Sequence, residues 1–139
     1  MNTVTVVNLI TAEIEKLNLH PLDDYSGDTL SRVAVRLASY KAGLGRHLNK
    51  ARKATWQAEK ILKLAKATSY QSLKESGINS TDAKELRILA VSEQYDAYIE
   101  AQSLEDQLNT LSFNVHDLID AIKSRLINLQ MEQRESNVT

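Results

Sequence analysis

The scarcity of helix-breaking residues constrains the fold of this chain most strongly. Among its 139 residues there is one proline, Pro21, and there are four glycines. β-Sandwiches and barrels need turn residues about every 8–12 positions, and long stretches of this sequence contain none. The sequence therefore predicts an all-α fold built from long helices.

Two helices are expected in the first half of the chain. Apolar residues recur at helical spacing in residues 4–17, which predicts a short helix that begins after Thr3 and ends before Pro21. A polar loop then leads to Asp28, a good N-cap for a second helix over residues 29–76. The apolar seam of the second helix comprises Leu30, Val33, Leu37, Tyr40, Leu44, Ala51, Ala58, Ile61 and Ala65.

A third helix is expected over residues 81–133, after a turn at Gly77 and a cap at Ser80 or Thr81. It has two apolar stripes that are out of phase, which predicts a bend or a change of packing partner near residues 101–103. The first stripe comprises Ile88, Val91, Tyr95 and Tyr98. The second comprises Leu104, Leu108, Leu111, Val115, Leu118, Ile122 and Leu129.

Two glycines lie inside the second predicted helix. Gly43 and Gly45 each cost the helix about 1 kcal/mol relative to alanine. They predict either a kink or a close approach of another helix.

The predicted architecture is a long antiparallel hairpin over residues 29–139, preceded by a short helix and loop over residues 1–28. A rod of this kind cannot bury two extended seams within one chain. We therefore expect a homo-oligomer, with the second stripe of the third helix as its oligomerisation surface.

Positive charge is concentrated in the second helix. Residues 32–74 contain eleven Lys or Arg and one acid, Glu59, although the whole chain has a net charge of −1. Residues 75–139 contain five basic and twelve acidic residues. Heptad positions place the cations along one side of the helix, as a continuous track that can bind phosphates. The track includes Arg46, Lys50, Arg52, Lys53, Lys60 and Lys66.

A plainer interpretation of the same charges stays open. A charged helix face is often only solvated, and the carboxylates of the acidic third helix can pair with the flanks of the basic one. Three aromatic residues are interleaved with the cations, and exposed aromatic rings can stack on bases. Tyr40 is on the seam and is expected in the core, whereas Trp56 is off the seam and suits either base stacking or a subunit interface.

Several kinds of chemistry have no support in the sequence. The chain has no cysteine, which excludes disulfides and thiolate metal sites and fits a reducing compartment. His116 and Asp120 share a helix face, but no second ligand pair accompanies them, so we expect no metal and no cofactor. Neither a signal sequence nor a membrane span is predicted. We expect a cytoplasmic protein that is not an enzyme.

One stretch resembles a known family. The residues "DLIDAIKSRLINLQMEQ" (117–133), and "DAIKSR" within them, are similar to the end of phage recombination mediators of the UvsY type. The Lys-rich segment "AEKILKLAKATSYQ" (58–71), a glycine-bearing break and an acidic helix follow the same order. The gapped resemblance covers residues 37–131, and it departs from the family pattern at Leu126, where a glycine is expected.

This resemblance implies a small helical accessory of homologous recombination in a phage-infected bacterial cytoplasm. Such proteins bind single-stranded DNA, form hexameric or heptameric rings, and help a RecA-like recombinase to replace single-strand-binding protein. By position, the resemblance adds Lys63 to the DNA-binding residues and assigns self-assembly to the C-terminal helix. The alternative from the residues alone is a non-enzymatic phage scaffolding or adaptor protein.

Overall fold

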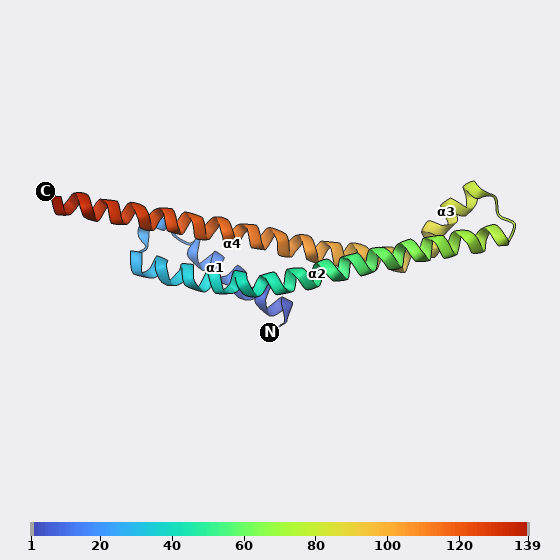
Figure 1. Cartoon of the computed structure of the whole chain (residues 1–139), viewed down its shortest axis with the longest axis horizontal. Helices are drawn as coiled ribbons and strands as arrows, with labels where there is room; N and C mark the ends of the chain where they lie inside the picture. The colour runs from blue at the N-terminus through green and yellow to red at the C-terminus, as the bar shows by residue number, and fades with distance from the viewer. Residues whose placement is uncertain (1, 139) are drawn as a thin grey trace. The chain divides into compact units, whose positions relative to one another are not determined.

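A computed structural model describes residues 2–138, and within them it contains α-helices, one 3-10 turn and no strand. The elements are α1 (Thr3–Leu17), η1 (Leu22–Asp24), α2 (Gly27–Glu75), α3 (Ser80–Ala90) and α4 (Ser92–Val138), as Figure 1 shows. The all-α fold predicted from the scarcity of proline and glycine is confirmed.

The chain divides into two compact units. Unit 1 contains residues 1–47 and 108–139, and unit 2 contains residues 48–107. Each long helix contributes to both units, so this division differs from the expected one into residues 1–28 and 29–139.

The helix caps differ from the predicted caps by one or two residues. The Asn2 side chain accepts a hydrogen bond from the Thr5 backbone at 2.8 Å and caps α1 in place of Thr3. Ser26 Oγ accepts from the Thr29 backbone N–H at 3.1 Å, whereas Asp28 pairs with Arg32 in the first turn of α2. Each cap satisfies an N–H group that the first helical turn leaves without a partner.

The third predicted helix is two helices. Asn79 caps α3 by accepting a hydrogen bond from the Asp82 backbone at 2.9 Å, so neither Ser80 nor Thr81 is the cap. Val91 then leaves helical geometry, with φ −110° and ψ 19°, and α4 begins at Ser92. Helix α4 is continuous through residues 101–103, so the helix has no break there, and the predicted bend or change of packing partner stays a prediction.

Helix α2 ends at a glycine with a left-handed conformation. Gly77 has φ +87°, its N–H donates to the Lys74 carbonyl at 3.0 Å, and the Ile78 N–H donates to the Leu73 carbonyl at 3.2 Å. These two bonds form a Schellman motif, which satisfies carbonyls at the end of the helix. The C-terminal role predicted for Gly77 is confirmed.

The glycines inside α2 have a different environment. The helix is continuous through Gly43 and Gly45, and a Cβ built at either glycine meets no atom within 4 Å. No neighbouring helix therefore requires a glycine at these positions, and the predicted close approach is wrong.

Two alanine variants should consequently have opposite effects. We expect Gly77→Ala to lower the free energy of unfolding by about 1 kcal/mol, because alanine is strained at positive φ. We expect Gly45→Ala to raise it by about 0.5–1 kcal/mol through helix propensity. Urea unfolding followed by circular dichroism measures both. A destabilising Gly45→Ala would show that a glycine is needed at this point of α2.

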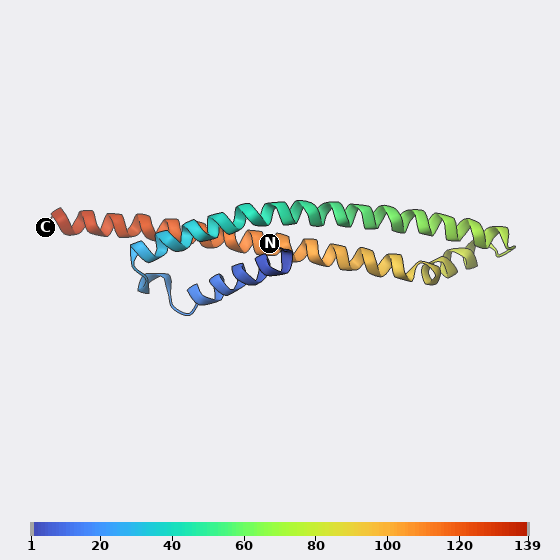
Figure 2. The ribbon, with the colours of Figure 1, turned by 90° about the horizontal axis from the view of Figure 1, so that it is seen from below.

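The core of unit 1 lies where α1 packs against α2 and α4 (Figure 2). It contains Val6, Ile10, Leu17, Leu30, Val33, Leu37, Leu44, Leu108, Leu111, Val115, Ile119 and Ile122. Four of the predicted oligomerisation residues, Leu108, Leu111, Val115 and Ile122, are thus buried within a single chain. Leu118 and Leu129 are half-buried, and Leu104 is 39% exposed. Their role in self-association stays a prediction.

The core of unit 2 is thinner. Its buried apolar residues are Leu48, Ala51, Leu62, Ala83 and Val91. The predicted seam residue Ile61 is 58% exposed, and Leu62 is buried in its place. An ideal helix drifts about 20° per heptad from a strict seven-residue repeat, so a seam that starts at Leu30 has moved by one position here.

Candidate nucleic-acid interface

The predicted DNA-binding residues divide between the two units. Arg46 belongs to unit 1, and the other seven belong to the α2 segment of unit 2. Within that segment Lys66 is half-buried, and the other predicted residues are exposed: Lys50, Arg52, Lys53, Trp56, Lys60 and Lys63.

Helical spacing brings several of these residues onto one face. Positions 52, 56, 60, 63, 70 and 74 follow one another at intervals of three, four or seven residues, which places them along a single side of a helix. We call this set the α2 stripe, and it spans about 33 Å. It comprises Arg52, Trp56, Lys60, Lys63, Tyr70 and Lys74. Lys53 lies at its edge, and Lys50 lies on the opposite flank.

Only part of the positive charge in this segment is neutralised. Lys63 Nζ lies 3.1 Å from Glu59 Oε1, and Arg52 Nε lies 4.0 Å from Glu105 Oε1. Both pairs are at the surface, where such pairs contribute little. Across residues 2–138, no carboxylate lies within 4.0 Å of the ammonium groups of Lys50, Lys53 or Lys60. Intramolecular pairing therefore accounts for two cations of the segment.

Trp56 is the most exposed aromatic residue of the stripe. Its side chain is 62% exposed, and the Lys60 ammonium lies 5.3 Å from the centroid of its ring. This cation–π contact leaves ring surface open to solvent, beside a positive charge. Tyr40, which was expected in the core, is half-buried.

Three of the four cations of α2 in unit 1 have partners, and the exposed Arg46 has no carboxylate within 4.0 Å among the described residues. Arg36 donates to Glu13 Oε1 through Nε at 3.0 Å and Nη2 at 2.7 Å, and Arg32 lies 3.0 Å from Asp28. Lys41 Nζ lies 2.8 Å from His116 Nδ1, and Asp120 Oδ2 lies 3.2 Å from His116 Nε2. Unpaired positive charge on α2 is thus found mainly in unit 2.

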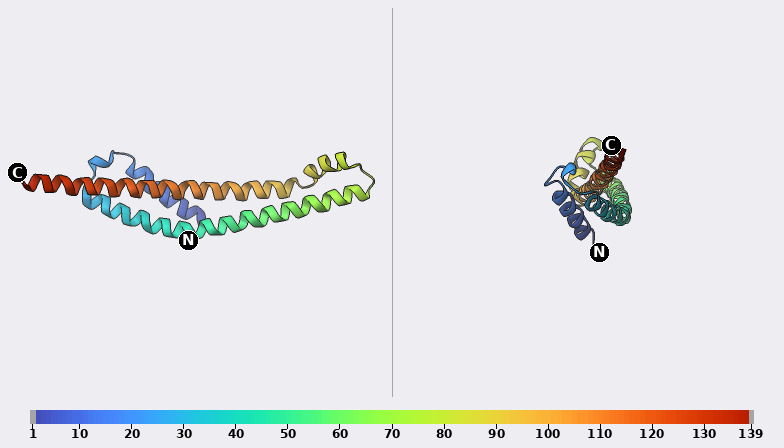
Figure 3. Two further views of the ribbon diagram at one scale, coloured as in Figure 1. Left: turned by 45° about the horizontal axis from the view of Figure 1, so that its top comes forward. Right: turned by 90° about the vertical axis from the view of Figure 1, so that its left-hand side faces the viewer.

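The structure adds a group of residues that the sequence did not single out. Helix α3 lies beside the end of α2 (Figure 3). At the turn between them, the Arg87 guanidinium carbon lies 5.8 Å from the centroid of the Tyr70 ring, and Lys74 Nζ donates to Ser80 Oγ at 2.9 Å. We call Tyr70, Lys74, Ser80, Lys84 and Arg87 the turn cluster. Lys84 and Arg87 were overlooked because they belong to the acidic part of the sequence.

The pKa of Tyr70 is lowered below its usual value, first by a hydrogen bond with Ser80 and then by the nearby charges of Lys74, Lys84 and Arg87, whereas burial acts in the opposite direction. Cations close to a phenol favour its ionised form. The Tyr70 hydroxyl therefore reports on the charge around it.

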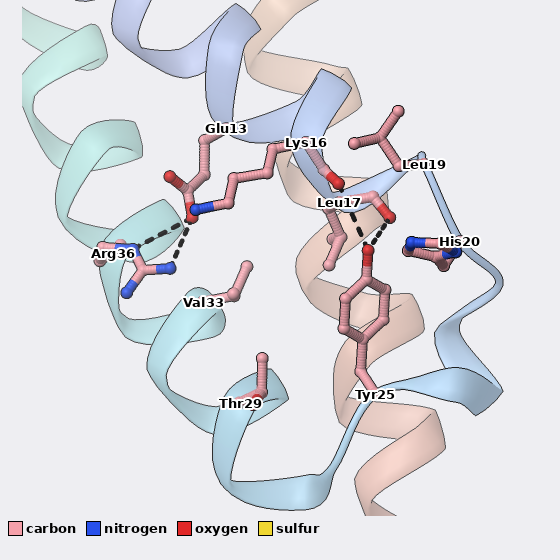
Figure 4. A pocket seen from close by; sticks show the side chains of 9 residues that line it. All are labelled: Glu13, Lys16, Leu17, Leu19, His20, Tyr25, Thr29, Val33 and Arg36. Atoms are coloured by element: carbon pink, nitrogen blue, oxygen red, sulfur yellow. Dashed lines mark hydrogen bonds and ion pairs between the residues drawn. The ribbon is translucent and has the colours of Figure 1, made fainter.

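Unit 1 contains a cavity of about 280 Å³ between α1, α2 and the loop that joins them. Figure 4 shows Arg36 and Glu13 paired with each other at its rim, and the Tyr25 hydroxyl donating to the Leu17 carbonyl at 2.9 Å. Arg36, Glu13 and the Tyr25 hydroxyl thus already have partners, Leu17 and Val33 supply apolar walls, and Lys16 and His20 also belong to the lining.

Among the described residues there is neither a membrane-spanning segment nor a metal-binding cluster. None of their helices combines the length and the hydropathy that a bilayer span requires. Within residues 2–138, no three His, Asp or Glu side chains are grouped so that they could hold a metal ion.

Comparison with known proteins adds no assignment. No protein-family model matches the chain, and it has no significant match among curated proteins or solved structures.

Proposed function

We propose that this chain is a recombination mediator that binds single-stranded DNA without reading its sequence. It helps a RecA-like recombinase to displace single-strand-binding protein, and it performs no catalysis. The α2 stripe carries this proposal, because it combines exposed cations with an exposed tryptophan on one helix face. The resemblance of residues 37–131 to UvsY-type mediators supports the same function, in the cytoplasm of a phage-infected cell.

The two kinds of side chain in the stripe have different tasks. Lys and Arg neutralise phosphates and release counterions, which supplies affinity for any sequence. Aromatic rings stack on bases, and each stacked base contributes about 1–3 kcal/mol. Single strands expose bases and phosphates together, so this combination favours them over duplex DNA.

Self-association completes the proposal. We propose that the chain forms a helical hairpin and that copies assemble into a ring, which holds one strand at several weak sites. Because four of the predicted oligomerisation residues are buried in unit 1, the exposed apolar side chains of unit 2 are better suited to contacts between copies. Apart from Trp56, the most exposed of them are Ile61, Leu64, Ile88 and Leu89.

Fluorescence anisotropy of labelled oligo-dT tests the proposal. Each phosphate neutralised on a single strand contributes about −0.7 to the slope of log affinity against log salt. The four cations of the stripe should contribute about −3 to this slope, which corresponds to a loss of affinity of roughly 50-fold between about 50 and 200 mM salt. Oligo-dC should behave in the same way. Absence of binding at low salt would refute the proposal.

A scaffolding function is the second candidate. The exposed apolar side chains of unit 2 favour it, since an apolar surface of this kind indicates protein contacts. Light scattering with and without oligo-dT separates the two functions. A scaffold would form the same oligomer in both samples and leave the DNA free.

A further inference from the structure

The turn cluster brings three cations from two helices around one hydroxyl group. Ser80, Lys84 and Arg87 are spaced at i, i+4 and i+7, so they share one face of α3. Tyr70 and Lys74 are the last two members of the α2 stripe. Ala83 is fully buried beside this face of α3, where its small side chain allows close packing in unit 2.

The positive charges of the cluster have no counter-charge. Among the described residues, no carboxylate lies within 4.0 Å of Lys74, Lys84 or Arg87. Arg87 Nε is closed off from solvent and has no hydrogen-bond partner among the described residues, so a phosphate from solvent has to be held by the other guanidinium nitrogens and the two ammonium groups. An oxyanion held by these groups would relieve the repulsion between the three cations.

The acidic residues nearest in sequence do not form ion pairs with the cations of the cluster. Asp82 Oδ2 accepts a hydrogen bond from the Asn79 side chain at 2.8 Å, and Glu75 Oε1 accepts from the Gln71 side chain at 3.3 Å. Glu85 lies on a different face of α3 from Lys84. The cluster therefore stays positive, because the nearby carboxylates are hydrogen-bonded to other side chains or lie on another face of α3.

We propose that the turn cluster is a phosphate-binding site, which holds a backbone phosphodiester of single-stranded DNA where the strand passes from the α2 stripe onto α3. Arg87 and Lys84 supply charged donors from α3, and Lys74 supplies one from α2. Arginine binds phosphate oxygens in a bidentate manner, and lysine binds them as a point charge. This inference depends on the proposed function and extends it to residues outside the basic helix.

The double variant Lys84→Gln/Arg87→Gln tests the site. Loss of two phosphate contacts should make the salt slope of oligo-dT binding shallower by about 1.4 and weaken binding by about 25-fold at about 0.1 M salt. Lys123→Gln/Arg134→Gln removes the same charge from exposed positions in unit 1 and should leave the slope unchanged. The charge-retaining variant Lys84→Arg/Arg87→Lys should restore most of the affinity.

The outcomes separate this inference from the proposed function. If the wild-type chain binds oligo-dT and the double variant binds with the same salt slope, the proposed phosphate site is wrong. The proposal that the α2 stripe binds DNA is unaffected by that result. If the wild-type chain does not bind, the proposed function fails first. Helix content by circular dichroism shows whether each variant is folded.

A second readout reports directly on the cluster. A bound phosphate offsets the cations that lower the pKa of Tyr70, so saturating oligo-dT should raise that pKa. The Cζ resonance of labelled tyrosine follows the titration, and Tyr70→Phe identifies its signal among the five tyrosines. An unchanged pKa at saturation would overturn the proposal, even if the double variant binds more weakly.

Discussion

The triple variant Arg52→Ala/Lys60→Ala/Lys63→Ala should bind oligo-dT about 100-fold more weakly than the wild-type chain at about 0.1 M salt. These three cations lie along one face of α2 in unit 2, and each is exposed. Because each contributes about 0.7 to the salt slope, the slope should also become shallower by about 2. Anisotropy at several salt concentrations measures both effects.

A matched variant shows whether position or total charge matters. Arg32→Ala/Lys123→Ala/Arg134→Ala removes three exposed cations from unit 1 and gives the same net charge. Its binding should stay within about threefold of wild type, since diffuse electrostatic attraction is screened at this salt concentration. Equal losses in both variants would mean that binding depends on net charge alone, and the α2 stripe would lose its special role.

The second large effect concerns stability. Ile122 is fully buried in unit 1, and truncating such a side chain to alanine removes buried apolar area and leaves a cavity. We expect Ile122→Ala to lower the free energy of unfolding by about 2–5 kcal/mol. Urea unfolding followed by circular dichroism measures this change.

Ile127 provides the control on the same helix. Its side chain is 57% exposed, so Ile127→Ala should change the free energy of unfolding by no more than about 0.5 kcal/mol. The sequence interpretation assigned Ile122 to contacts between chains. If Ile122→Ala reduced oligomer mass and left the unfolding of the single chain unchanged, that assignment would be right and the core described for unit 1 would be wrong.

The fold class could be read from the sequence because it depends on local properties. A chain that has one proline and few glycines supports long helices. The positions of the buried residues along the helices could not be predicted as well. In α4 the half-buried positions include Gln94 and Glu105, so the apolar residues alone form two stripes that are out of phase. A helix packed against a neighbour tolerates polar residues at such positions when their heads reach solvent.

The candidate site was predictable where it depends on one helix. Helical spacing alone places Arg52, Trp56 and Lys60 on a common face of α2. The turn cluster depends on the break at Val91, which lets α3 be a separate short helix beside the end of α2. No proline or glycine marks that break, so Lys84 and Arg87 could not be joined to Tyr70 from the sequence.

Trp56 allows the most direct measurement of the central claim, because it is the only tryptophan in the chain. Its emission reports on the α2 stripe and on nothing else. If single-stranded DNA lies along the stripe, oligo-dT should quench this emission to saturation, and higher salt should reverse the quenching together with the anisotropy. An emission that stays unchanged while anisotropy shows saturated binding would place the DNA elsewhere and contradict the account.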